Sequence, residues 1–487
     1  MTTDTLIGLV VQAVAVSILF WRLGRAWLRH VGVVFILAAV VYTGVGEILV
    51  EAFPGQSQYR ALLVGQTRYV GQYTLLASIT ILALTVTYLV VLGHDTRTAI
   101  GHRGELLAAR RILDWRLLGL FSVFAVLLTV RGVGYSAILT AAGTISTTSG
   151  IVLQFILVAV PLAAFSLVAI LGRRWLAPAL IVVILAIAVT GERGPIVFAS
   201  LAFLYACARF GIRFSRPAVI IGVIAFVLVG LVITSARANS GRTAFAAGGG
   251  AAAKIGAVSA GITGITDNAT FSQLKHDFGY RLDGNSWGAL VMESYAAGLP
   301  PAGPRSLIND FRDAIPSLIY RSKLSQNATS LAEGVYQLQA LDLPTIEVTG
   351  LPTQLGTILG YWGPIGLLLV GPVLGMIFAV ADRWLLRRAT ALSLVIGVGL
   401  VICAASYEHA LNVYPETLRG VVVLALVVWA FEAARRSVGA AVTRRQAPAV
   451  DSGAATAPGG PTAPLPRRRA QPMSAGRFEG FEVDWEN

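Results

Sequence analysis

The most unusual polar group in the chain is Thr190-Gly-Glu-Arg-Gly-Pro195, which places Glu192 and Arg193 between two apolar runs. The flanking residues, 175–189 and 196–207, carry no charge. A charged side chain facing lipid costs about 2.5–3.5 kcal/mol at the centre of a membrane helix and less near its ends. The hexapeptide is therefore either a tight turn whose charges lie among lipid headgroups or an anion-binding site at the mouth of a membrane cavity.

Further charged residues lie where other apolar runs end. A carboxylate and an imidazole are adjacent at Glu408 and His409. Arginines occupy comparable positions at Arg237, Arg242 and Arg419. The planar guanidinium binds phosphate oxygens in pairs, so these arginines and Arg193 are candidates for holding a diphosphate headgroup. The alternative is that each arginine pairs with a nearby carboxylate or with lipid phosphate.

A second polar group lies in residues 267–339, which also contain many aromatic side chains. Most of its charged residues are expected to be solvated surface. Three cations are candidates for contacts with sugar or phosphate: Arg281, Arg312 and Lys323. The aromatic content favours a folded region, with helical periodicity at 286–297 and 305–320.

The elements that must position these residues are membrane helices. Hydrophobic residues make up 55% of the 487-residue chain and charged residues only 13%, about half the charged fraction of a typical soluble protein. Apolar stretches long enough to span a bilayer, or nearly so, fall at 4–20, 31–50, 73–92, 117–133, 150–171, 175–190, 195–210, 217–234, 355–381, 390–406 and 419–434. The predicted fold is an all-α polytopic membrane protein with about 11 transmembrane helices.

Positive charge distinguishes the two sides of this predicted bundle. One set of alternate short loops carries sixteen arginines and the opposite set carries five. Because positively charged loops stay in the cytoplasm, we expect the N-terminus outside and the C-terminus inside. The candidate residues of 190–195, 237–242 and 408–419 then share the outer face. The net charge of +13 is explained mainly by these loops and gives no reason to expect a nucleic-acid partner.

The sequence divides into a transmembrane domain, 1–436, and a tail, 437–487. The domain includes one large extracytoplasmic loop, 235–353, between the eighth and ninth predicted helices. Its Ala/Gly-rich stretch 244–265 is expected to be either flexible or a loosely inserted hairpin. The tail is rich in Ala, Pro and Gly and is predicted to be disordered in the cytoplasm.

No cofactor or metal is expected. Cys207 and Cys403 both lie in apolar runs, so neither a disulfide nor a metal site is indicated. Motifs of the zinc, Walker and dinucleotide-binding kinds do not occur in the sequence, which argues against an ATP-driven pump.

Three stretches resemble the Wzy-like oligosaccharide repeat-unit polymerases of bacterial O-antigen and exopolysaccharide synthesis. Thr190–Pro195 is similar to that family's T-G-x-R-G element, and Ala314–Lys323 to the Pro-to-Lys stretch late in its large outer loop. Gln354–Gly366 is similar to the N-F-G-x-x-G start of the following helix. One position departs from the family pattern, since Thr357 stands where many members carry Glu.

This resemblance implies a glycosyltransferase of the bacterial cytoplasmic membrane. It would move a growing glycan from polyprenyl diphosphate onto another lipid-linked repeat unit outside the membrane. Such a reaction needs cations that stabilise the departing diphosphate, the proposed role of Arg193, Arg237, Arg242 and Arg419. It also needs a base for the acceptor hydroxyl, for which Glu408, His409 and Glu192 are the candidates. The implied partners are polyprenyl-diphosphate-linked oligosaccharide, membrane lipid, and a chain-length regulator or other polysaccharide-assembly proteins.

Two alternatives remain open. A related ligase would transfer finished glycan to a different acceptor. A non-catalytic polysaccharide or lipid transporter would carry charged or Pro/Gly-broken positions near mid-span in two corresponding halves. The charges here cluster at the outer ends of the predicted helices, and runs such as 31–46 and 217–234 are free of charge, which disfavours the transporter.

Overall fold

The computed structural model describes residues 1–53, 60, 63, 67–93, 116–123, 147–188, 193–212, 214, 216–246, 251–301, 303, 308, 353–388, 390–408, 411 and 413–446. Within these ranges the regular structure is entirely helical, without strands. The chain forms two compact units, 1–432 and 433–487. In the second unit, the described residues are the last turns of a helix that ends at Gln446.

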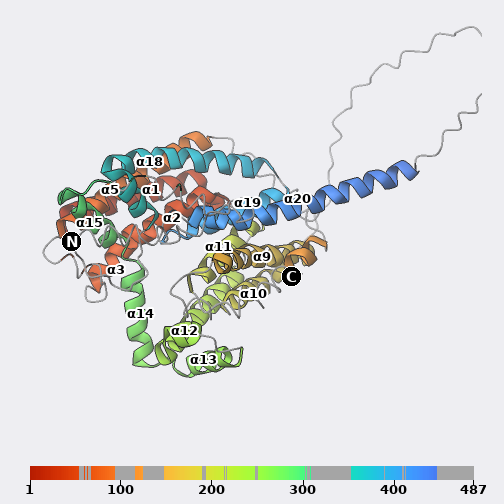
Figure 1. Ribbon diagram of the computed structural model, residues 1–487, viewed down its shortest axis with the longest axis horizontal. Coiled ribbons are helices and arrows are strands. Elements are labelled where there is room, and N and C mark those ends of the chain that lie inside the picture. The colour runs from red at the N-terminus through yellow and green to blue at the C-terminus, as the bar shows by residue number, and fades with distance from the viewer. Residues whose placement is uncertain are drawn as a thin grey trace, which may run out of the picture. The chain divides into compact units, whose positions relative to one another are not determined.

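Figure 1 shows the described helices, which include the described parts of the apolar runs of the sequence. In chain order they are α1 (Thr3–Leu23), η1 (Gly24–Arg29), α2 (Val31–Val40), η2 (Val41–Val45), α3 (Gly46–Ala52), α5 (Thr67–Leu92), α9 (Thr147–Leu171), η4 (Arg173–Trp175), α10 (Leu176–Ala188), α11 (Arg193–Arg209), α12 (Arg216–Ala246), α13 (Ala251–Thr263), α14 (Asn268–Arg281), α15 (Gly284–Ala296), α18 (Gln354–Arg387), α19 (Ala391–Ala405) and α20 (Val413–Gln446). Of the predicted range 117–133, the structure describes only the helical residues up to 123.

Four helical stretches in the described residues are long and apolar enough to cross a membrane. They are Thr3–Leu23, Val31–Ala52, Arg68–Leu92 and Gln354–Arg387. Shorter apolar helices lie at Leu157–Leu171, Gly194–Arg209, Ile220–Ala236, Ala391–Ala405 and Gly420–Ala434.

Small residues allow α18 to pack closely along α5. Cβ atoms built on Gly371 and Gly375 would lie 2.7 Å from the carbonyl oxygen of Thr80 and 2.5 Å from that of Leu84. The two glycines are one helical turn apart, the small-xxx-small spacing that brings membrane helices into backbone contact. On the other side of α5, α1 packs in the same manner through Gly8, whose Cβ position is 3.1 Å from Thr74 O.

A buried carboxylate holds the start of α2 against α18 and α5. Asp382 is fully buried. Its Oδ1 accepts a hydrogen bond from Val31 N at 2.8 Å. Its Oδ2 accepts from Gly32 N at 3.0 Å and from the Tyr88 hydroxyl at 2.8 Å. Asp382 therefore acts as an N-cap supplied from a distant helix, satisfying backbone donors that a helix N-terminus leaves unpaired.

Arg209 has a comparable structural role at the same, C-terminal end of α18. Its exposed fraction is only 7%, and its guanidinium donates to the carbonyl oxygens of Ser393, Leu385 and Arg388. These acceptors include carbonyl groups that the C-terminus of a helix leaves free. The side chain thus joins α11 to α18 and α19, a role beyond the loop charge that the sequence indicated.

The predicted outer loop begins with a helical hairpin. The predicted run 217–234 continues as α12 to Ala246, and α13 packs back against it. A Cβ atom on Gly261 would lie 2.5 Å from Val232 O. Residues 244–265 were expected to be either flexible or a loosely inserted hairpin. The part of them that forms α13 packs against α12 as the second arm of a hairpin. The periodicity at 286–297 corresponds to α15, whereas 305–320 lies outside the described residues apart from 308.

Candidate functional site

The turn that follows α19 carries a buried carboxylate, Glu408. Ser406 closes the helix, because its backbone N–H and its hydroxyl both donate to Ile402 O, at 2.9 and 2.7 Å. Tyr407 is fully buried, and Glu408 is only 4% exposed. A carboxylate this buried needs hydrogen-bond or charge partners to remain ionised.

Tyr42 and the start of α11 contact the two oxygens of this carboxylate. The Tyr42 hydroxyl donates to Glu408 Oε2 at 3.1 Å. Glu408 Oε1 lies 3.2 Å from the position that a Cβ atom would take on Gly194. Gly194 is the second residue of α11, which begins at Arg193. The negative charge therefore lies at the positive end of a helix dipole, where anions are stabilised.

The start of α18 holds the same turn from a second side. Gln354 N donates to Tyr407 O at 3.0 Å, and the Gln354 side-chain amide donates to Cys403 O at 3.0 Å and Ser406 O at 3.2 Å. Tyr414, in α20, donates its hydroxyl to Gln354 Oε1 at 2.9 Å. Gln354 thus fixes the turn between α19 and α20 to the first residue of α18.

Thr353, which caps α18, has a strained backbone. Among the described residues it is the one non-glycine residue with positive φ, at 47°. Its hydroxyl oxygen accepts from Gly356 N at 3.1 Å, and its carbonyl oxygen accepts from the Thr357 hydroxyl at 2.8 Å. Backbone strain of this kind persists where surrounding contacts enforce it and is concentrated at functional sites. Thr357 therefore supports the cap.

α15, from the predicted outer loop, begins beside the same residues. A Cβ atom on Gly284 would lie 2.7 Å from Thr353 Cγ2 and 3.6 Å from Tyr42 O. Asp283 caps α15 by accepting from Ser286 N at 3.1 Å. The start of α11 therefore contacts the Glu408 carboxylate itself, whereas the starts of α15 and α18 contact Tyr42, Thr353 and Tyr407 around it. The N-terminus of α11 favours a negative charge at that point.

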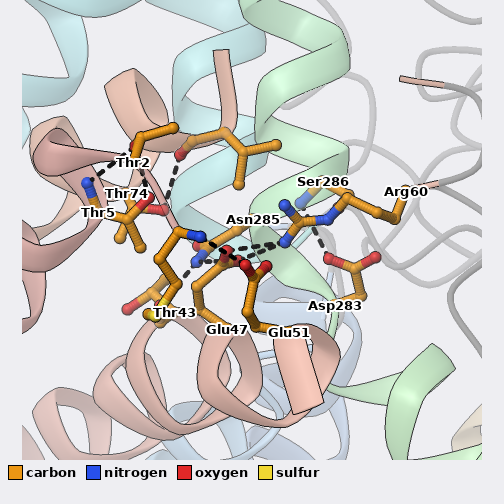
Figure 2. Close-up of polar contacts among 12 residues, drawn as sticks. Thr2, Thr5, Thr43, Glu47, Glu51, Arg60, Thr74, Asp283, Asn285 and Ser286 are labelled. Carbon is orange, nitrogen blue, oxygen red and sulfur yellow. Dashed lines mark hydrogen bonds and ion pairs between the residues drawn. The ribbon is translucent and has the colours of Figure 1, made fainter. Parts of the chain in front are cut away.

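A second polar cluster adjoins this site and is built on Glu47 (Figure 2). Both Glu47 oxygens accept from Arg60 Nη2, at 2.8 and 2.7 Å. Asn285 Nδ2 donates to Glu47 Oε2 at 3.2 Å and to Thr43 O at 2.7 Å. The cluster thereby joins α3 and η2 to α15.

The charge of Arg60 is maintained by its neighbours. Burial, the largest single influence, disfavours the protonated guanidinium. The attraction and hydrogen bonds of Glu47, with smaller contributions from Asp283 and Glu51, outweigh burial and raise the pKa of Arg60 above its usual range. Arg60 and Glu47 therefore form a buried ion pair, with side chains 15% and 1% exposed.

The structure brings together two of the sequence elements singled out for chemistry, 190–195 and 407–409, through Gly194 and Glu408. Five predicted cations have backbones in helices: Arg193 in α11, Arg237 and Arg242 in α12, Arg281 in α14 and Arg419 in α20. The other predicted site residues lie outside the described residues: Glu192, His409, Arg312 and Lys323. In the described residues, no group of three or more His, Cys, Asp or Glu side chains is placed to hold a metal ion.

Sequence reasoning missed Tyr42, Glu47 and Asn285. Tyr42 lies in 31–46, the charge-free part of a predicted span, so its type and position gave no sign of a contact with Glu408. Glu47 carried a usable signal, because an acidic residue inside a predicted membrane span needs a partner. That partner, Arg60, follows shortly after in the chain.

Comparisons of the chain with protein-family models, curated proteins and solved structures find no match.

Proposed function

We propose that this chain is a membrane glycosyltransferase that polymerises polyprenyl-diphosphate-linked oligosaccharide repeat units on the outer face of the bacterial cytoplasmic membrane. The observation that carries the proposal is the position of Glu408, buried at the start of α11 beside Gly194. Two sequence elements that were singled out independently, one cationic and one acidic, meet there. Their meeting supports a single site containing both a base and an anion-binding helix terminus.

In the proposed reaction, the acceptor sugar hydroxyl attacks the anomeric carbon of the donor glycan. The bond from that carbon to the diphosphate oxygen breaks, and polyprenyl diphosphate leaves with the bonding electron pair. Glu408 accepts the hydroxyl proton, acting as general base. The positive end of α11 and Arg193, its first residue, stabilise the charge that develops on the diphosphate.

The contacts at the two ends of the bundle support the proposed topology. The distribution of arginines in the sequence predicts an outer position for three residues that lie in one cluster, Glu408, Gly194 and Thr353. Arg209 and Arg388, placed on the cytoplasmic side, also contact each other. Elements assigned to the same side therefore contact each other, which is consistent with that assignment.

Deletion of the gene followed by mass spectrometry of polyprenyl-linked glycans tests the proposal. A polymerase deletion accumulates single lipid-linked units, whereas a ligase deletion accumulates long lipid-linked polymer. Unchanged lipid-linked glycans would contradict any role in this chemistry. Complementation with Glu408→Gln, Arg193→Ala or Arg193→Lys is expected to leave single units unextended.

A matched control is Glu51→Gln, which changes a carboxylate whose side chain is 42% exposed on α3. It is expected to restore full polymer length. The amount of each variant in the membrane fraction must equal that of the wild type. Normal polymer from both Glu408→Gln and Arg193→Ala would overturn the proposed site.

A further inference from the structure

The predicted span at 31–50 is interrupted by one π-helical turn, η2, at Val41–Val45. Such turns are rare inside α-helices and are frequent at functional sites. A π turn shifts the following side chains around the helix axis relative to a continuous α-helix. The side chain it presents toward Glu408 is that of Tyr42.

Buried polar groups from three other helices hold this turn in place. Thr43 donates its hydroxyl to Ala39 O at 2.7 Å, and Gln12 Nε2 donates to Thr43 Oγ1 at 3.0 Å and to Ser78 Oγ at 2.9 Å. Asn285 donates to Thr43 O at 2.7 Å. These bonds satisfy backbone and hydroxyl groups that the altered helical register would otherwise leave unpaired. The turn is therefore a fixed element.

Tyr42 contacts two consecutive residues of the Glu408 turn. Its ring lies against that of Tyr407, with centroids 5.6 Å apart, and its hydroxyl donates to Glu408 Oε2. Glu408 Oε1 is directed toward Gly194. The carboxylate is thus oriented at both oxygens, by the phenol at one and by the start of α11 at the other.

We propose that Tyr42, presented by the π-helical turn, is a positioning residue that sets the orientation of the Glu408 carboxylate for proton acceptance. This inference rests on the proposed function. By donating to Oε2, Tyr42 fixes the plane of the carboxylate, whose Oε1 faces the start of α11. In this proposal Tyr42 acts through Glu408 and not on the substrate directly, so its removal lowers kcat and leaves KM unchanged.

The test uses purified full-length variants in proteoliposomes. The substrate is the single-unit polyprenyl diphosphate glycan extracted from the deletion strain. Tyr42→Phe removes one hydrogen bond to a charged group. The free energy of such a bond corresponds to a change of about 10- to 100-fold in rate. We expect kcat to fall by at least tenfold with KM within twofold of the wild type. Wild-type kcat in Tyr42→Phe, or a rise in KM alone, overturns the inference.

Tyr295→Phe is the matched control for loss of a structural hydroxyl. The Tyr295 hydroxyl donates to backbone oxygens, Leu359 O at 2.6 Å and Gly360 O at 3.0 Å. We expect this variant to lower thermal stability without changing kcat. An equal fall of kcat in both variants would reduce Tyr42 to a structural role.

A double-mutant cycle with Glu408→Asp, which retains a carboxylate on a shorter side chain, tests whether the effect passes through Glu408. In that background Tyr42→Phe should change kcat by less than twofold, because the shorter side chain has already left the phenol. A full tenfold loss in both backgrounds overturns the inference. Full activity of Glu408→Gln would remove the proposed role of Glu408 as base, and with it this inference. Unchanged lipid-linked glycans in the deletion strain would instead remove the proposed function itself, so the two failures are distinguishable.

Discussion

Gly194 and Glu408, far apart in the sequence, meet at the first turn of α11, where Glu408 Oε1 lies 3.2 Å from the Cβ position of Gly194. That separation is shorter than an ordinary van der Waals contact, so a methyl group at Gly194 would displace the carboxylate by a few tenths of an ångström. The contact between these residues depends on glycine having no side chain.

Gly194→Ala is therefore expected to lower polymerisation without lowering stability. Alanine favours a helix over glycine by about 0.5–1 kcal/mol, so thermal stability should hold or rise. Misplacement of a reacting group by about 1 Å can cost about 100-fold, and the smaller shift here should cost about tenfold in kcat. Gly230→Ala, where a Cβ atom meets nothing within 4 Å, is the control. Equal activities of the two variants would contradict this account.

The buried pair of Glu47 and Arg60 leads to a prediction about stability. Removing one partner of a buried ion pair leaves an uncompensated charge and costs about 3–5 kcal/mol. Because the Arg60 side chain is 15% exposed, we expect Glu47→Gln to cost about 3 kcal/mol, at the lower end of that range. Thermal unfolding in detergent would measure the loss.

The double variant Glu47→Gln/Arg60→Gln separates the charge from the packing. It removes both charges while keeping polar side chains that hydrogen-bond to each other and to Asn285. It should unfold at a higher temperature than Glu47→Gln alone. If the double variant were less stable than Glu47→Gln alone, the ion pair would stabilise the fold by more than the neutralisation of two buried charges.

Much of the fold could be predicted because apolar length and loop charge are local properties of the sequence. The run at 355–381 became α18, and the periodicity at 286–297 became α15. The apolar run at 217–234 lies within α12, whose helical backbone continues to Ala246 through residues that give no hydrophobic signal.

The candidate site could be predicted only in pieces. Glu192, Arg193 and Glu408 were identified because charges at the ends of apolar runs are conspicuous. That Gly194 meets Glu408 depends on how α11 packs against α19, which no local pattern encodes. The π turn that presents Tyr42 was invisible for the same reason, because it is held by side chains from other helices.

Close packing of α18 on α5 predicts a strong effect at Gly375. A Cβ atom there would lie 2.5 Å from the backbone oxygen of Leu84, which cannot move without shifting α5. Overpacking of this kind costs about 1–3 kcal/mol, which exceeds the gain of about 1 kcal/mol in helix propensity. Gly375→Ala should therefore lower the melting temperature, whereas Gly230→Ala should not. A Gly375→Ala variant as stable as the wild type would show that the two helices are further apart.

His30 predicts how stability depends on pH. This residue directly precedes α2 and is 2% exposed. Its Nδ1 lies 3.9 Å from Asp382 Oδ2, which is too far for a hydrogen bond. Burial, with a smaller contribution from the charge of Arg29, lowers the pKa of His30 from its usual 6.5 to about 4. The imidazole is therefore neutral in the folded protein near neutral pH.

Between pH 6.5 and about 4, the unfolded chain binds a proton at His30 that the folded chain does not bind. Stability must then fall as the pH is lowered through this window, by about 3 kcal/mol in total for this group. His30→Gln removes the titrating group and should flatten the dependence. Melting temperatures of both proteins between pH 7.5 and 4.5 provide the measurement, since titrating groups remote from His30 contribute equally to each. Parallel curves would show that His30 is protonated in the folded state and stabilised there by Asp382.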